Sequence, residues 1–154
     1  MANYTLRWDQ ALPAAKRFVV LAAFNNEAVL DKNTGLVWER APSEFGLDWF
    51  SAKDLCLNKN VGGTVGWRLP SVAELSSVRD PALSAPFVPA SAFTNVLKNT
   101  YWSATETVWV TGSSDHAWLV YFGDEVDLTR VGHGPKDIQH GVWCVRGGMN
   151  ADRY

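Results

Sequence analysis

The chain has 154 residues, which predicts one domain that buries roughly two thirds of the surface exposed by its unfolded form. Hydrophobic residues make up 47% and charged residues 19%, with 7 Pro and 12 Gly, and this composition excludes disordered, collagen-like and low-complexity chains. The formal net charge of -2 excludes the basic excess of non-specific nucleic-acid binders, so we expect no nucleic-acid partner.

The first predicted elements are three short strands between Arg17 and Arg40, separated by turn signals at Asn25-Asn26 and 31–35. The apolar run 18–24 follows two basic residues and so imitates a signal peptide, but it lies late in the chain and is short, and we interpret it as a strand. Because no run approaches about 18 apolar residues, we expect no membrane span.

Two helices follow the predicted strands. Asp48 is a suitable N-cap, and Trp49, Ala52 and Cys56 form one buried stripe of a helix that ends near Asn58. After a break at Gly62-Gly63, the sequence 71–74 matches a capping box, with Ser71 as N-cap and Glu74 at N3, and predicts a second helix to about Arg79.

The second half of the chain contains a proline-rich loop at 80–89 and then strand patterns. We predict these strands at 101–105, 117–122, 126–131 and 142–146. Segregation of strands and helices along the chain, without regular alternation, favours an α+β fold with a mainly antiparallel sheet. The 8 Trp and 7 Phe agree with an aromatic-rich fold and favour recognition over catalysis.

The two cysteines, Cys56 and Cys144, lie 88 residues apart, so neither a CxxC zinc motif nor a redox motif can form. They are either one disulfide or two buried thiols. His140 lies four residues before Cys144, which in a strand is about 13 Å, too far for an activated thiolate. We therefore expect no enzyme activity.

Spaced motifs resemble the Lcl C-terminal domain family, the terminal domain of bacterial collagen-like adhesins. They cover nearly the whole chain, and we place the domain at 17–148, between an N-terminal extension (1–16) and a C-terminal tail (149–154). The motifs are Val29-Leu-Asp31, Thr34-Gly-Leu-Val-Trp38, Trp49-x-x-Ala52 with Cys56, Trp67-Arg-Leu-Pro-Ser71 with Glu74-Leu75, Tyr101-Trp-Ser-Ala-Thr105, Ala117-Trp118 and Trp143-Cys-Val-Arg-Gly147.

The resemblance implies a C-type-lectin-like fold, in which two helices pack on short antiparallel strands and the chain ends meet in one sheet. It also implies that Cys56 on the first helix pairs with Cys144 on the last strand. A disulfide indicates an extracellular, cell-surface or periplasmic location, although this chain shows no signal peptide. Two thiols in a cytosolic member are the alternative.

The family's described role is adhesion, with binding of sulfated glycosaminoglycans by collagen-like members. A sulfated polymer needs a basic stripe, and the nearest candidates are Arg130, His133, Lys136 and His140. Trp109, Trp118 and Tyr121 are candidates for sugar stacking or contact with a protein partner. Trp38, Trp67, Trp102 and Trp143 lie inside the family motifs, and we expect them in the core.

We predict no cofactor and no metal site. The calcium-binding tripeptides of lectins are absent, and the acidic turn at 123–127 reads as a solvated hairpin. His116, His133 and His140 are 17 and 7 residues apart, which matches no helical zinc motif, although a loop-borne site stays open.

Two further functions stay open. No Asn occurs between Thr100 and Gly148, although nine occur elsewhere, as adenine mutagenesis of a diversity-generating retroelement receptor would leave it. A structural surface-assembly subunit is the other alternative. The predicted partners are a glycan, including a sulfated one, or a cell-surface protein, and the collagen-like members suggest a homotrimer.

Overall fold

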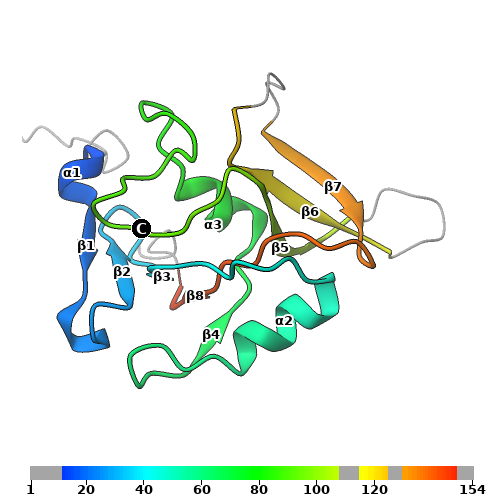
Figure 1. Ribbon diagram of the computed structural model, residues 1–154, viewed down its shortest axis with the longest axis horizontal. Helices are drawn as coiled ribbons and strands as arrows, with labels where there is room; N and C mark the ends of the chain where they lie inside the picture. Colours follow the sequence, from blue (N-terminus) through cyan, green and yellow to red (C-terminus); the bar gives the residue numbers. More distant parts are fainter. Residues whose placement is uncertain (1–11, 108–114, 125–129, 149–154) are drawn as a thin grey trace, which may run out of the picture.

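The computed structural model describes residues 12–107, 115–124 and 130–148, which form two antiparallel sheets packed with helices (Figure 1). This arrangement confirms the α+β class. The elements are α1 (Ala14–Arg17), β1 (Phe18–Val20), the 3-10 helix η2 (Ala22–Phe24), β2 (Ala28–Asp31), β3 (Val37–Glu39), α2 (Trp49–Leu57), β4 (Trp67–Arg68), α3 (Val72–Ser77), β5 (Thr100–Glu106), β6 (His116–Tyr121), β7 (Val131–Pro135) and β8 (Val145–Arg146).

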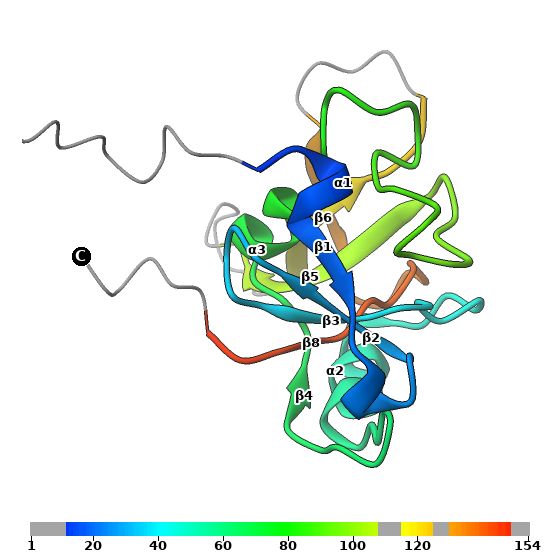
Figure 2. The same ribbon diagram turned by 90° about the vertical axis from the view of Figure 1, so that its left-hand side faces the viewer.

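The first sheet has five strands in the order β1-β2-β3-β8-β4. The three predicted N-terminal strands are confirmed, and the last strand, β8, lies between β3 and β4, so the first and last described strands share one sheet (Figure 2). The predicted strand 18–24 is wrong after Val20. The chain turns into η2 there because Asn25 and Asn26 adopt left-handed backbone angles, which asparagine tolerates.

A buried ion pair fixes the start of this sheet. Arg17 donates two hydrogen bonds to the carboxylate of Asp31, at 2.7 and 2.6 Å, and both side chains are buried. The same carboxylate accepts hydrogen bonds from the backbone of Asn33 and the hydroxyl of Thr34. Because every oxygen is satisfied, the carboxylate is tolerated in the interior and shapes the turn between β2 and β3.

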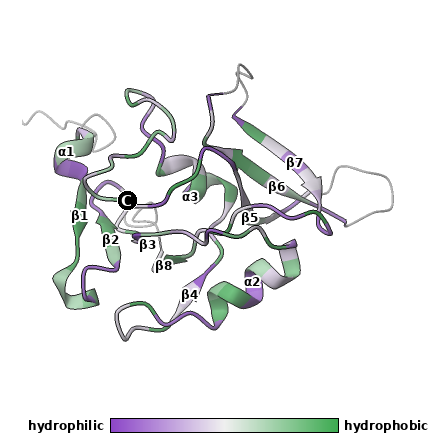
Figure 3. Ribbon diagram, viewed as in Figure 1, coloured by the Kyte–Doolittle hydropathy of each residue, from purple (hydrophilic) through white to green (hydrophobic). Residues whose placement is uncertain are grey.

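The second sheet has the order β5-β6-β7. Its first two strands agree with the prediction. The expected third strand, 126–131, lies mostly outside the described residues, and β7 runs from Val131 to Pro135. Gly132 permits this pairing, because a Cβ there would lie 3.0 Å from the Tyr121 ring. Figure 3 shows that β7 is less hydrophobic than its neighbour β6, in agreement with its place at an edge of the sheet.

Both predicted helices form where their caps indicate. Asp48 accepts a hydrogen bond from the backbone N–H of Ser51 at the start of α2. At α3, Ser71 and Glu74 make the full capping box, and Glu74 also accepts two hydrogen bonds from Arg68 on β4, at 2.8 and 2.7 Å. This helix ends at Ser77, slightly before the predicted Arg79.

Two apolar clusters hold these layers together, and the second sheet contributes to both. Side chains alternate across its strands, so Tyr101 and Val120 join one cluster, while Trp102 and Leu119 join the other. The four motif tryptophans are confirmed as core residues: Trp38, Trp67, Trp102 and Trp143 are at most 1% exposed. No helix in the described part of the chain is long and apolar enough to cross a membrane.

Candidate functional site

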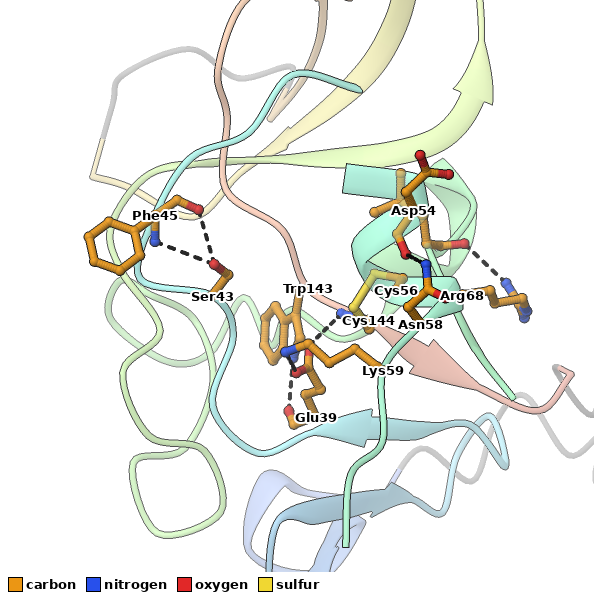
Figure 4. Close-up of a disulfide and its surroundings, with 11 residues drawn as sticks. Glu39, Ser43, Phe45, Asp54, Cys56, Asn58, Lys59, Arg68, Trp143 and Cys144 are labelled. Atoms are coloured by element: carbon orange, nitrogen blue, oxygen red, sulfur yellow. Dashed lines mark hydrogen bonds and ion pairs between the residues drawn. A yellow bond between two sulfur atoms is a disulfide. The ribbon is translucent and has the colours of Figure 1, made fainter. Parts of the chain in front are cut away.

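A disulfide joins Cys56 on α2 to Cys144, directly before β8 (Figure 4). Both cysteines are fully buried. The disulfide confirms the pairing that the resemblance implied. The link attaches α2 to the five-stranded sheet across 88 residues of chain. Since neither sulfur is a free thiol, neither cysteine can serve as a nucleophile in this state.

A buried carboxylate lies beside this disulfide. Glu39 is 3% exposed, pairs with the ammonium of Lys59, and accepts a hydrogen bond from the backbone N–H of Cys144 (Figure 4). Burial raises the pKa of Glu39, although Lys59 and the Cys144 N–H oppose the shift. A cleft of about 380 Å³ opens next to this pair, and its lining includes Asn26, Glu27, Glu39, Arg40, Lys59 and Thr94.

Sequence reasoning did not identify this cleft. Glu39 follows Trp38 in a strand, and no local pattern indicates that a charged residue there is buried. Other polar lining groups also have hydrogen-bond partners: Arg40 donates to the carbonyl of Asn26, and Glu27 accepts from the N–H of Gly62. These hydrogen bonds join neighbouring segments of the chain, so we interpret the lining of this cleft as structural.

A second candidate site lies on β6 and β7. Trp118 pairs with His133 across the strands, and His116 lies on the same face one step further along β6. The His133 ring centroid is 5.8 Å from that of Trp118 and 5.5 Å from that of His116. Trp118 and His116 are half-buried and His133 is exposed. We call these three side chains the outer strand face.

A cleft of about 390 Å³ begins at the end of the outer strand face. His116 lines it, together with Phe50, Asp115, Pro135, Lys136 and Asp137. Phe50 is 60% exposed. No sequence pattern indicates a role for it, because the stripe of Trp49, Ala52 and Cys56 identifies only the buried side of α2, and Phe50 lies on the other side. An exposed phenylalanine at the mouth of a cleft provides an apolar contact surface beside charged groups.

The predicted basic residues do not form one stripe. Arg130 is exposed and lies over the Phe87 ring, at the opposite end of β7 from Lys136, about 20 Å along the strand. Lys136 is buried, bonds to Glu106 at 2.7 Å, and lies over the Trp49 ring.

The remaining candidates are also separate. His140 packs edge-on against the Trp102 ring and hydrogen bonds to Thr100, and burial lowers the pKa of its imidazole. Tyr121 is half-buried and lines a smaller hollow with Lys98 and Asp124. Trp109 lies outside the described residues. The structure therefore brings together Trp118 and His133 from the predicted set, and adds His116 to them.

The described residues contain no group of three or more His, Cys, Asp or Glu side chains arranged to hold a metal ion. One polar atom of the outer strand face is nevertheless unusual: Nδ1 of His116 is buried and has no hydrogen-bond partner. Buried polar atoms without partners are rare in folded proteins and call for an explanation.

The fold and the disulfide define a small, disulfide-linked α+β domain. The chain belongs to the Lcl C-terminal domain family, whose model matches residues 27–146. This membership indicates a bacterial surface or adhesion-type module. A comparison with curated proteins gave no match.

Proposed function

We propose that the protein is a non-catalytic, extracellular adhesion module that binds a glycan at the outer strand face and the adjoining cleft. The observation that carries this proposal is the row formed by Trp118, His133 and His116, which leads into a cleft with Phe50 at its mouth. A half-buried tryptophan offers a flat apolar surface for a sugar ring, while imidazoles supply hydrogen bonds to hydroxyl or anionic groups.

The arrangement of elements supports a C-type-lectin-like interpretation of the fold. Helices α2 and α3 pack on antiparallel strands, and the first and last described strands, β1 and β8, share one sheet. A disulfide joins α2 to the segment before β8. A disulfide is stable in oxidising compartments, and this supports an extracellular, cell-surface or periplasmic location.

Two features favour recognition over catalysis. The cysteines are joined to each other, so the thiolate chemistry considered from the sequence has no nucleophile. His140, the base nearest in sequence, hydrogen bonds to Thr100 and lies against a tryptophan instead.

A glycan array tests the proposal, and it should include sulfated glycosaminoglycans, calcium or chelator, and two salt concentrations. We expect binding that does not require added calcium and that Trp118→Ala weakens at least about tenfold. Phe45→Ala is the matched control, because Phe45 is an aromatic residue that is 77% exposed and lies outside the cleft. Equal binding by both variants would place the ligand elsewhere.

Salt dependence distinguishes two ligand classes at this site. A sulfated polymer would bind more weakly at higher salt, because exposed charges are screened. The scattered positions of Arg130, Lys136 and His140 favour a ligand held mainly by stacking, and hence a modest salt effect. A blank array would instead favour a protein ligand.

One observation supports the retroelement-diversified receptor as a second candidate. The Asn-free part of the chain, 100–148, supplies β5 to β8 and all three side chains of the outer strand face. A near-copy of its coding region beside a reverse transcriptase gene would support this candidate, and its absence would favour a fixed adhesin. A surface-assembly subunit would self-associate in solution without any ligand.

A further inference from the structure

We propose that His116 and His133 form a two-histidine site for a divalent transition-metal ion such as Zn²⁺. The remaining coordination positions would be open to water or to an oxygen of a bound ligand. The proposal concerns metal binding itself and stands whether or not the outer strand face binds a glycan.

Strand pairing creates this site. His116 is opposite Pro135 and His133 is opposite Trp118, so the two histidines are diagonal neighbours on one face of adjacent antiparallel strands. Diagonal neighbours are within reach of long side chains, and these two rings already touch. Their separation of 17 positions in the sequence is therefore irrelevant to their separation in space.

The distance between the rings fits one shared ion. Zinc binds imidazole nitrogen at about 2.0–2.1 Å with tetrahedral geometry, which places the centroids of two ligating rings about 5 Å apart. The observed separation is 5.5 Å, with 66° between the ring planes. Binding of one ion requires that one nitrogen from each ring faces a common point.

A second observation is independent of the ring distance. Nδ1 of His116 is buried and has no hydrogen-bond partner, so one nitrogen of the pair is left unsatisfied. A metal ion bound there would accept its lone pair and remove the cost of burying an unpaired polar atom.

The charges around His116 favour a cation. Asp115 and Asp137 line the same cleft as His116. The basic residue in the lining of this cleft is Lys136, and its ammonium donates to the carboxylate of Glu106. Imidazole ligands suit Zn²⁺, Ni²⁺ and Cu²⁺, whereas Ca²⁺ and Mg²⁺ prefer oxygen ligands, so the site should discriminate between these groups.

The test uses the chain without any histidine tag, titrated with Zn²⁺ by calorimetry and by NMR of the imidazole signals. The chain has 3 histidines, so His140 is an internal control. We expect Zn²⁺ to shift the signals of His116 and His133 and to leave that of His140 unchanged. Calorimetry should give one ion per chain, and Ca²⁺ should produce neither effect.

Variants then assign the ligands. His133→Ala, at an exposed position, should weaken Zn²⁺ binding at least about tenfold, and His116→Gln should do the same. His140→Gln should bind Zn²⁺ like the parent chain. The proposal is overturned if excess Zn²⁺ shifts no imidazole signal, if binding survives in the double variant of His116 and His133, or if it depends on His140.

Discussion

Two tryptophans show how differently the core and the outer strand face use the same side chain. Trp143 is fully buried, contacts four aromatic rings at centroid distances of 5.2 to 5.8 Å, and donates a hydrogen bond to the carbonyl of Glu39. Trp118 on the outer strand face is half-buried, and its ring packs edge-on against His133. The first arrangement stabilises the fold, and the second leaves apolar surface available to a ligand. Stability and binding should therefore respond to different substitutions.

We expect the largest loss in the free energy of unfolding when the disulfide that attaches α2 beside the five-stranded sheet is removed. In the double variant Cys56→Ala/Cys144→Ala, the unfolded chain regains the freedom of an 88-residue loop, which lowers the free energy of unfolding by about 4 to 5 kcal/mol. Urea unfolding followed by tryptophan fluorescence measures this change. Reduction of the parent chain should give a similar loss, and coincident urea midpoints for parent and variant would contradict the prediction.

The next largest effect is the difference in unfolding free energy between variants of the two tryptophans. Trp143→Ala should lower the free energy of unfolding by about 3 to 5 kcal/mol, because it leaves a cavity among four aromatic rings. Trp118→Ala should cost about 1 kcal/mol, because its side chain is already partly in contact with solvent. Both values come from urea unfolding of each variant beside the parent chain. Equal losses would mean that the outer strand face is part of the structural core.

The sequence predicts the two capped helices and the first three strands better than the outer strand face, for a physical reason. Caps and turns act within a few residues, so Asp48, Ser71 and the turn at 31–35 determine their local structure wherever they occur. The buried stripe of Trp49, Ala52 and Cys56 follows from helical spacing in the same way.

The outer strand face depends on pairing between segments that no local pattern relates. His116 and His133 meet only because β6 and β7 pair in one register, and both residues lie outside the strands predicted at 117–122 and 126–131. Likewise, the burial of Lys136 depends on Trp49 and Glu106, which come from two other elements. Tertiary contacts of this kind override the expectation that a basic residue near a turn is exposed.

The smallest effect concerns acid stability at the junction of β4 and α3. Burial alone would raise the pKa of Glu74, but hydrogen bonds from Arg68 and from the backbone of Ser71 outweigh it, and the pKa is lowered from its ordinary value of 4.5. A carboxyl group with a lowered pKa stabilises the folded state above its unfolded pKa, and this contribution is lost as the pH falls through the folded value. Glu74→Gln removes the charge and one of the acceptors.

Glu74→Gln should therefore lower the free energy of unfolding by about 1 kcal/mol near neutral pH, and the difference from the parent chain should shrink as the pH falls below about 4.5. Urea midpoints measured between neutral and acidic pH give the difference at each step. Glu39, whose pKa is raised by burial, changes the free energy of unfolding with pH in the opposite direction. Because Glu39 is present in both chains, its contribution cancels in the difference between them. The exposed Glu44 is the matched control, and Glu44→Gln should follow the parent chain throughout. A difference for Glu74→Gln that stayed constant with pH would show that the hydrogen bonds, rather than the charge, hold α3 against β4.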